Sequence, residues 1–575
     1  MGCSRGKSKR TKEEKLNHMA KVDYKKEREN DITTIKNSTH PRKVVVGGPG
    51  TGKSYLFSEL IKNKLSKGKT NFLAITFIGK LRDVLADDLC GLAKTTTMHS
   101  FARSFILQQY EGWNYHPRMY ELISEDLKAE GVETFKIGDE NYIQKTKYYQ
   151  AVGDDDVVHY AVRICKKYPN KIPVYDLILV DEYQDFSLIE SEFVDLLAQK
   201  NNIVIVGDDD QSLYGFRGSS PFFIRKKYDL KNIHWESYTL RFCSRCTEIM
   251  IKYFHTLVER FNLNNPVESD PAKKRIKKEY ICYAPDGERD SKIYDSRANP
   301  QIHLIKNCPV GMIAYKIKNE LEKLVENQKV KEILVIGEGQ SCEALLKKIA
   351  QQLKNYGFKN VDYRGRDDGC VLRFRQAIID AYKFIAKDES SLLGWRILGN
   401  IANQEEKEQH VRNAKTLIAI IDGTPSKLKK IKEEDIRILE ATIENWGDES
   451  DETATEAERN KQNEEIRKGV LIQDLKRSNL HLSRPLCNLD IAVCNILNSK
   501  GLNADIVFII GFDQGKFPSK VNATDSEIYQ MLVATTRAKK RVYLINTIKS
   551  KVSGFVDCLN VADLNIEEIK TQCRK

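Results

Sequence analysis

The chain has 575 residues and carries 93 Lys and Arg against 81 Asp and Glu, a net charge of +12. This length exceeds what one hydrophobic core supports, so we expect several domains. The positive surplus favours an acidic partner such as nucleic acid without establishing one. No run of about 18 apolar residues occurs and the first residues lack an apolar segment, so we expect no membrane span, no secretory signal and a cytoplasmic location.

The cysteines suggest a reduced protein. Thirteen of them, an odd number, are scattered at irregular intervals, which suits intracellular thiols better than a disulfide framework. Cys243 and Cys246 form a CxxC pair, but no second pair follows at zinc-like spacing. We therefore expect no metal at that pair and interpret it as coincidence.

Two groups of apolar, β-branched runs predict the fold. After a basic extension at residues 1–30, the runs KVVVGG, NFLAITF, DLILVDE and NIVIVGDD alternate with helical patterns up to residue 209. A second group, EILVIGEG, LDIAVCNI, ADIVFIIGF and RVYLINT, follows between residues 332 and 547. Strands separated by helices indicate parallel sheets with crossover connections, so we predict an α/β fold with two such domains. The long interval from residue 78 to residue 174 predicts an inserted helical subdomain, and a second helical block precedes LDIAVCNI.

A glycine-rich turn joins the first predicted strand to a helix. Gly47, Gly52, Lys53 and Ser54 match the pattern G-x-x-x-x-G-K-[ST]. The backbone N–H groups of such a turn wrap a phosphate chain, its lysine neutralises the β- and γ-phosphates, and its hydroxyl holds Mg²⁺. The predicted nucleotide-binding residues in this stretch are Gly47, Gly48, Pro49, Gly50, Thr51, Gly52, Lys53, Ser54 and Tyr55.

Acidic residues directly follow another predicted strand, in YDLILVDEYQD. Asp181 is the candidate Mg²⁺ partner, beside Ser54, and Glu182 is the candidate to orient or deprotonate the attacking water. An isolated Asp-Glu pair would be read as a solvated strand end, but beside a phosphate loop we favour the catalytic interpretation.

With these motifs the chain resembles the UvrD/Rep family of superfamily 1A DNA helicases, with the motifs in the same order. The matching stretches are GGPGTGKS, TFIGK (76–80), TMHSFA (97–102), VDEYQD, GDDDQSLYGFRG (207–218), LRFCSRC (240–246), NSKGLNADIVFIIGFDQGKFPS (498–519) and LVATTRAKKRVYLI (532–545). The resemblance implies two RecA-like P-loop NTPase domains, ATP and Mg²⁺ as cofactors, and single-stranded or tailed duplex DNA as partner. It also implies the domain limits: motor domain 1A at 31–104 and 172–240, insertion 1B at 105–171, motor domain 2A at 241–396 and 486–550, insertion 2B at 397–485, and a tail at 551–575.

The resemblance assigns further roles residue by residue. Gln211 would sense the γ-phosphate, Arg245 and Arg537 would reach it from the second motor domain, and Gly501 would lie at the nucleotide. The implied contacts to nucleic acid are Thr76, Phe77, His99, Tyr214, Phe216 and Arg217. Base stacking needs only an aromatic face and reads no sequence. The alternative for Tyr214 and Phe216 is that either is a core aromatic.

Several positions depart from the family pattern. The stretch before the phosphate loop has no glutamine to read adenine, and Ser244 falls where the family has a stacking tyrosine, unless a shifted register brings in Phe242. We therefore predict that Tyr55 supplies the stacking. Leu497 and Asn503 replace a histidine that touches DNA and a glutamate, so the grip on DNA is expected to differ.

Two functional expectations stay open. One is an ATP-dependent 3′-to-5′ DNA helicase or translocase acting in repair, replication or defence against foreign DNA. The other is a nucleic-acid-stimulated ATPase switch that gates a separate nuclease or effector subunit, favoured by the departures at Ser244, Leu497 and Asn503 and by the short insertions. The few residues after LVATTRAKKRVYLI leave no room for a fused nuclease, so we expect any nuclease to be a separate partner. RNA as the track is a weaker alternative.

Overall fold

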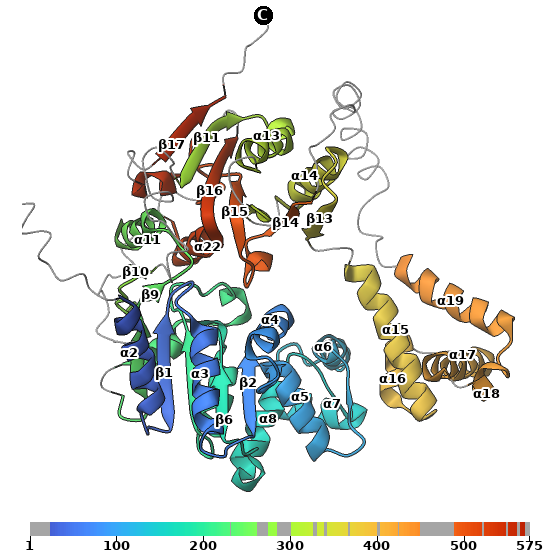
Figure 1. Ribbon diagram of the computed structural model, residues 1–575. Helices are drawn as coiled ribbons and strands as arrows, with labels where there is room; N and C mark the ends of the chain where they lie inside the picture. Colours follow the sequence, from blue (N-terminus) through green and yellow to red (C-terminus); the bar gives the residue numbers. More distant parts are fainter. Residues whose placement is uncertain are drawn as a thin grey trace, which may run out of the picture.

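The fold is that of a computed structural model, which describes residues 24–229, 232–260, 274–283, 301–325, 330–338, 342–365, 369–399, 403–423, 425–448, 488–519, 523–547, 550–559 and 564–569. Figure 1 shows two domains, each built on a parallel sheet, and a separate helical block beside them. Among the described residues, no helix combines the length and the apolar character needed to cross a membrane.

The first sheet confirms the predicted parallel α/β arrangement. Its strand order is β3 (Lys94–Thr97), β2 (Phe72–Thr76), β6 (Leu177–Val180), β7 (Ile203–Gly207), β1 (Arg42–Gly47) and β8 (Glu236–Leu240), all parallel. Successive side chains of a strand point to opposite faces. Val45 accordingly packs under α2 (Tyr24–Asn37), α3 (Lys53–Leu65) and α4 (Gly79–Leu89), whereas Val44 and Val46 belong to the opposite cluster. Both faces are therefore buried, as the continuous apolar runs predict.

The opposite face of this sheet is covered by further helices, two of which lie partly or wholly within the predicted insertion at residues 105–171. These are α5 (Met98–Gln109), α8 (Val157–Lys167), α9 (Leu188–Leu197) and α10 (Phe222–Tyr228). Between α5 and α8 lie β4 (Asn114–Tyr115), α6 (Met119–Ala129), α7 (Glu140–Tyr149) and β5 (Ala151–Val152), and η1 (Pro169–Lys171) follows. The long interval between strands is thus mainly helical, because its apolar residues recur at helical spacing.

The second sheet has the order β13 (Asn360–Arg364), β14 (Asp490–Asn495), β12 (Glu332–Gly337), β15 (Ala504–Ile510), β16 (Ala538–Thr547), β11 (Ile302–Cys308) and β17 (Leu564–Glu568), again all parallel. Helices α13 (Ile313–Val325) and α14 (Glu343–Asn355) cover one face, and α11 (Glu248–Arg260) and α22 (Asp525–Thr536) lie against the other. η6 (Val310–Met312) and η10 (Gly554–Cys558) complete the domain. The expected C-terminal tail differs: residues 564–568 form an edge strand because Leu564 and Ile566 pair in register with Ile302 and Leu304.

The helical block begins earlier than predicted. It consists of α15 (Gly369–Lys387), α16 (Leu392–Leu398), α17 (Gln404–Asp422), α18 (Pro425–Leu428) and α19 (Glu433–Asp448), and α15 packs on α16, α17 and α19. The predicted start of insertion 2B, residue 397, therefore falls inside the helical block. The block begins with α15 because the apolar face of α15 is buried against α16, α17 and α19. Residues 449–485 of the predicted insertion, like residues 1–23 of the basic extension, lie outside the described residues.

The two insertions touch each other. Leu393 of α16 is fully buried in a cluster with Met119 and Ile123 of α6. Beside it, Arg396 Nε donates to Asp126 Oδ1 at 2.8 Å and Arg396 also pairs with Glu125 at 2.9 Å. The helical block is therefore held against the first domain as well as joined to the second.

Candidate active site

A phosphate-binding loop follows β1. Residues 48–52 lead into α3, whose N-terminus places its first backbone N–H groups toward the loop. Gly50 and Gly52 have φ of 68° and 88°, values that side chains with a Cβ rarely adopt. The Thr51 hydroxyl donates to the Gly48 carbonyl at 2.9 Å, which fixes the turn. Lys53 Nζ lies 3.4 Å from the Gly47 carbonyl, so its ammonium stays within the loop.

The acids that follow β6 lie beside this loop. Asp181 Oδ1 is buried with no hydrogen-bond partner among the described residues. Burying a carboxylate oxygen without a partner is rare because it lowers the stability of the folded protein. Burial and the adjacent Glu182 raise the pKa of Asp181. A divalent cation would satisfy the oxygen and remove that cost, so Asp181 and Ser54 fit a Mg²⁺ ion, which prefers a few carboxylate and hydroxyl oxygens.

Glu182 is held ionised by its neighbours. Its backbone is in the left-handed region, with φ of 52°, a conformation uncommon for a residue with a side chain. Gln184 Nε2 donates to Glu182 Oε2 at 2.6 Å. Burial alone would raise the pKa of Glu182, but Lys500 and Lys53 outweigh it and lower the pKa to about 2. The carboxylate is thus suited to accept a hydrogen bond from water across the whole neutral range.

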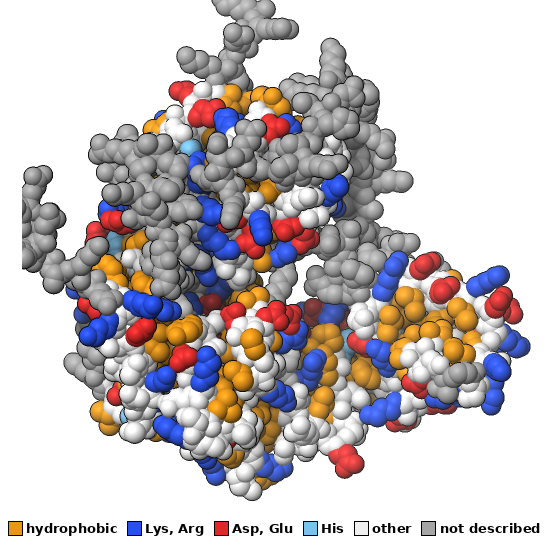
Figure 2. All heavy atoms as spheres, in the orientation of Figure 1, with side chains coloured by type: hydrophobic (Ala, Val, Ile, Leu, Met, Phe, Trp, Pro, Cys, Tyr) orange, Lys and Arg blue, Asp and Glu red, His pale blue; other side chains and the backbone are white. Residues whose placement is uncertain are grey.

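One cavity of about 620 Å³ brings the predicted hydrolytic residues together. From the first domain it is lined by Pro49, Gly50, Thr51, Gly52, Lys53, Ser54, Tyr55, Asp181, Glu182 and Gln211, and from the other side by Ser244, Arg245, Gly501, Asn503 and Arg537. Gly47 and Gly48, also predicted to bind the nucleotide, are not among the residues that line this cavity, and a Cβ on Gly48 would lie 2.2 Å from the Tyr280 ring. In the orientation of Figure 1, charged side chains gather where the two domains meet (Figure 2).

Arg537 spans the gap between the domains. It follows α22, is nearly fully buried, and its NH2 lies 3.3 Å from Gln211 Oε1. Its Nε donates to the Val533 carbonyl at 3.0 Å, which orients the guanidinium. Burial and the nearby Arg245 lower the pKa of Arg537 to about 9, so it still carries its charge at neutral pH. A buried guanidinium is stabilised more strongly by an incoming anion than a guanidinium in water would be.

Lys500 was not among the predicted site residues, although it lies next to Gly501. From the end of η9 (Leu497–Ser499) it reaches Asp185 of η2 (Tyr183–Asp185), with which it forms a buried ion pair, and its Nζ lies 3.4 Å from Glu182 Oε2. Burial alone would lower the pKa of Lys500, but Asp185 and Glu182 raise it above the usual range. Its position before Gly501 was the available sequence signal; its partners lie more than 300 positions away in the chain.

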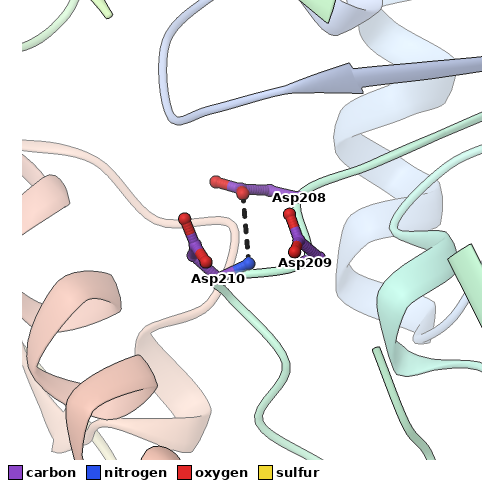
Figure 3. A group of neighbouring side chains, drawn as sticks. All are labelled: Asp208, Asp209 and Asp210. Carbon is purple, nitrogen blue, oxygen red and sulfur yellow. Dashed lines mark hydrogen bonds between the residues drawn. The ribbon is translucent and has the colours of Figure 1, made fainter. Parts of the chain in front are cut away.

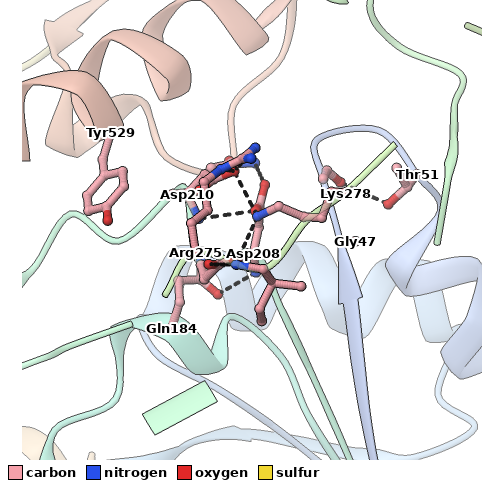
Figure 4. Close-up of polar contacts among 12 residues, drawn as sticks. Gly47, Thr51, Gln184, Asp208, Asp210, Arg275, Lys278 and Tyr529 are labelled. Carbon is pink, nitrogen blue, oxygen red and sulfur yellow. Dashed lines mark hydrogen bonds and ion pairs between the residues drawn. The ribbon is translucent and has the colours of Figure 1, made fainter. Parts of the chain in front are cut away.

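The acidic stretch after β7 forms a second ionic cluster. Asp208, Asp209 and Asp210 point toward one another (Figure 3), with oxygens close enough to hold a metal ion. Lys278 occupies that position instead: its fully buried Nζ lies 2.6 Å from Asp208 and 2.8 Å from Asp210, and it also pairs with Asp209. Arg275 adds a bond of 2.7 Å to Asp210 (Figure 4). The cluster is therefore a set of ion pairs, not a metal site.

This cluster links three parts of the molecule. Arg225 Nε donates to Asp209 at 2.8 Å, and Arg225 NH2 lies 3.2 Å from the hydroxyl of Tyr529 on α22. Gln211 Nε2 donates to Asp208 Oδ2 at 2.6 Å. Gln211, which contacts Arg537, is thus hydrogen-bonded directly to the aspartate cluster. A displacement of Gln211 at the cavity would therefore change a hydrogen bond of this cluster.

Aromatic and cationic side chains flank one end of the cavity. Tyr55 is about half exposed, and the Arg28 guanidinium lies 4.9 Å from its ring and 5.5 Å from the ring of Tyr283. Ser244, at the predicted stacking position, bonds to the Gly50 carbonyl, whereas Phe242 is buried. Among these groups the Tyr55 ring is the aromatic face that lines the cavity.

The predicted nucleic-acid contacts divide by exposure. Thr76, Phe77 and Tyr214 are buried, with Phe77 and Tyr214 rings 4.8 Å apart. Phe216, in η3 (Gly215–Arg217), is 70% exposed with Arg217 beside its ring. The imidazole of His99 is partly exposed and lies 3.6 Å from Glu190. Phe216 can receive a base as it stands, whereas Tyr214 must first leave its packing.

The site and the two parallel sheets define a class, the P-loop nucleoside triphosphatases built from two RecA-like domains. Two family models match: the UvrD/REP helicase N-terminal domain over residues 128–231, and the UvrD-like helicase C-terminal domain over residues 396–549. Over these two segments the chain is similar to UvrD/Rep-like helicases of superfamily 1A.

Curated relatives agree with this family. The chain is 22% identical over 469 residues to the ATP-dependent DNA helicase PcrA of Staphylococcus epidermidis, a match that covers 72% of this chain and 61% of that protein. It is 26% identical to an ATP-dependent helicase/nuclease subunit of Lactococcus lactis subsp. cremoris over 34% of this chain. It is 33% identical to the exonuclease/helicase subunit RexA of the same subspecies over 20% of this chain. The matches span only 18% and 9% of these two longer relatives.

Proposed function

We propose that this chain is an ATP- and Mg²⁺-dependent translocase on single-stranded DNA that unwinds tailed duplexes in the 3′-to-5′ direction. The observation that carries the proposal is that both domains contribute charged side chains to the cavity around the phosphate loop. A triphosphate placed there would contact Lys53 of the first domain and Arg245 and Arg537 of the second. Its binding and release would therefore change the position of one domain relative to the other.

Each residue has a defined task in hydrolysis. Lys53 and the backbone N–H groups of the loop hold the phosphates, and Ser54 and Asp181 would hold Mg²⁺, which neutralises charge on the phosphate oxygens. Glu182, kept ionised by Lys500, orients the attacking water and accepts its proton as the bond forms. Arg245 and Arg537 stabilise the charge that develops on the γ-phosphate.

The stretch 207–218 connects this chemistry to the DNA strand. Gln211 contacts Arg537 at the cavity, and a few residues further on the exposed ring of Phe216 offers a stacking face. Stacking is tolerant of sequence, which suits a protein that moves along DNA. Thr76, Phe77, His99, Tyr214 and Arg217 are proposed to line the same path.

A second candidate function has its own support. A nucleic-acid-stimulated ATPase that gates a separate nuclease would explain why Ser244 and Asn503 depart from the family pattern, and two of the similar proteins are named as helicase/nuclease or exonuclease/helicase subunits. Asn503 lines the nucleotide cavity, and its Oδ1 is buried without a hydrogen-bond partner among the described residues. Asn503 is therefore placed to contact the nucleotide, and we expect its change to alter how strongly DNA binding stimulates ATP hydrolysis.

Strand displacement separates the two functions. Purified protein, with dithiothreitol present, is given ATP, Mg²⁺ and duplexes carrying a 3′ or a 5′ single-stranded tail, with the Lys53→Ala variant as control. Displacement of the 3′-tailed duplex alone supports the translocase, and DNA-stimulated ATPase without displaced strand supports the switch. ATP hydrolysis that no DNA or RNA oligonucleotide accelerates contradicts both, and stimulation by RNA but not by matched DNA contradicts DNA as the track.

A further inference from the structure

Two cysteines lie against the phosphate loop. Strand β9 (Phe242–Cys243) ends at Cys243, the chain bends through residues 244–246, and α11 begins at Glu248. Cys243 Sγ donates to the Pro49 carbonyl at 3.0 Å, and the backbone N–H of Cys246 donates to Cys243 Sγ at 3.4 Å. Both side chains are buried, and both are thiols in this structure.

The residues between them belong to the nucleotide cavity. Ser244 donates to the Gly50 carbonyl through its N–H at 2.9 Å and through its hydroxyl at 3.0 Å. A Cβ on Gly50 would lie only 2.4 Å from the Arg245 Cβ, which shows how closely this bend packs on the loop. A change in the bend therefore moves Arg245 relative to the phosphates.

We propose that Cys243 and Cys246 form a reversible intramolecular disulfide that moves Arg245 away from the phosphates and turns nucleotide hydrolysis down. The bend at residues 244–246 brings the backbone N–H of Cys246 to 3.4 Å from Cys243 Sγ, so the two residues are neighbours in space. The side chain of Cys246 also hydrogen-bonds to Cys243, which outweighs burial and lowers the pKa of the Cys243 thiol to about 6. A thiol that ionises readily is the better nucleophile toward oxidants.

The chemistry needs a two-electron oxidant such as hydrogen peroxide. The Cys243 thiolate attacks a peroxide oxygen, the O–O bond breaks, and the products are a sulfenic acid and hydroxide. The Cys246 sulfur then attacks the sulfenic sulfur, the S–O bond breaks, and water leaves with the thiol proton. In total, two thiols and one peroxide give one disulfide and two waters, and a dithiol reductant reverses the change by exchange.

Other assignments of the pair are less well supported. Cys282 of β10 (Ile281–Cys282) lies opposite Cys243 in the paired strands, but its Sγ is directed to the Cys246 carbonyl at 3.6 Å. Within the described residues, the group with ligand atoms close enough for a metal ion is the aspartate cluster, not these cysteines. A disulfide within the CxxC pair is therefore favoured over a zinc site.

Peptide mapping tests the bond without nucleotide or DNA. The full-length protein is treated with hydrogen peroxide, blocked with iodoacetamide, digested with trypsin and examined by mass spectrometry. Trypsin cuts after Arg241, Arg245 and Lys252, so the disulfide joins peptide 242–245 to peptide 246–252. We expect this linked pair to appear with peroxide and to vanish with dithiothreitol. Its absence, or linkage of peptide 242–245 to the Cys282 peptide, would overturn the proposal.

Activity is compared with each variant's own reduced form. Oxidised wild type should hydrolyse ATP about tenfold more slowly or worse and recover with dithiothreitol, because a displacement near 1 Å in an active site costs on the order of a hundredfold. Cys246→Ser and Cys246→Ala should lose this sensitivity, whereas Cys90→Ser, which removes an exposed thiol, should keep it. Equal sensitivity in the Cys246 variants would overturn the switch. Because the linked peptide is detected without substrate, failure of the proposed helicase function would not hide the bond.

Discussion

Arg537, from the second domain, contacts Gln211, from the first, at 3.3 Å across the nucleotide cavity. Both groups are buried, and Gln211 is bonded on its other side to Asp208. Through Gln211, the second domain is thus connected to the cavity and to the aspartate cluster of the first domain. Each of these links can be broken separately.

Removing the arginine should stop catalysis but not nucleotide binding. Arg537→Ala is expected to lower the DNA-stimulated ATPase rate by roughly 10³- to 10⁵-fold, because an arginine on the γ-phosphate acts mainly in the transition state. The measurement is steady-state ATPase together with the Kd for a fluorescent ATP analogue. Arg82→Ala, which removes a surface arginine paired with Asp83, is the control. A Kd raised as much as the rate is lowered would show that Arg537 serves binding alone.

Breaking the aspartate cluster should destabilise the protein. Lys278→Met leaves three buried carboxylates without their shared cation, and breaking a buried ion pair from one side costs about 3–5 kcal/mol. Thermal and urea unfolding measure the loss. The exposed neighbour gives a matched control, Lys277→Met, which should unfold like the wild type.

A second substitution checks the reason for that loss. Burial opposes ionisation of Asp209, but Lys278 and Arg225 outweigh it and lower its pKa. Adding Asp209→Asn to Lys278→Met removes one uncompensated charge and should restore part of the lost stability. If the double variant were less stable than Lys278→Met by the full cost of Asp209→Asn alone, the two residues would not be coupled.

Local and long-range features differ in how far the sequence predicts them. The phosphate loop was predictable because glycines, lysine and flanking apolar runs occupy consecutive positions, and the acids Asp181 and Glu182 follow a strand directly. The ion pair between Asp208 and Lys278 was not predictable from the sequence. Lys278 belongs to the basic stretch KKRIKKEY, and which of its lysines is buried depends on the tertiary fold. The burial of Tyr214 was likewise left open by the sequence, since an aromatic after a strand suits both a core and a stacking surface.

Exposure predicts different results for the two aromatics after Gln211. Phe216→Ala should weaken binding of single-stranded oligonucleotides by about 1–3 kcal/mol, roughly 5- to 150-fold, equally for different sequences. Fluorescence anisotropy at fixed salt measures this, and thermal unfolding should be unchanged. Leu188→Ala, at another exposed apolar side chain, is the control. Tyr214→Ala should instead lower the melting temperature, because it leaves a cavity beside Phe77.

Base recognition should depend on Tyr55. Tyr55→Ala is expected to raise the Michaelis constant for ATP about tenfold, since stacking on an aromatic ring contributes about 1–3 kcal/mol. The comparison is made with GTP, and with Tyr148→Ala, at an exposed tyrosine of α7 that is not among the residues lining the cavity. An unchanged constant for ATP, with ATP and GTP used alike, would exclude Tyr55 as the stacking residue.

Finally, Asp156 should give the first insertion a stability that depends on pH. It is fully buried, accepts hydrogen bonds from Tyr142 at 2.9 Å and from the Gly153 N–H at 2.7 Å, and burial raises its pKa to about 7. Because the native state holds this proton to a higher pH than the unfolded chain, the stability gained is complete below about pH 4 and is lost as the pH rises toward 7, by roughly 4 kcal/mol at most. Hydrogen-exchange protection factors of α7 and α8 should therefore fall over this range. Asp156→Asn should flatten the profile, whereas Asp139→Asn, at an exposed carboxylate, should not; an unchanged profile in Asp156→Asn would assign the pH dependence to another group.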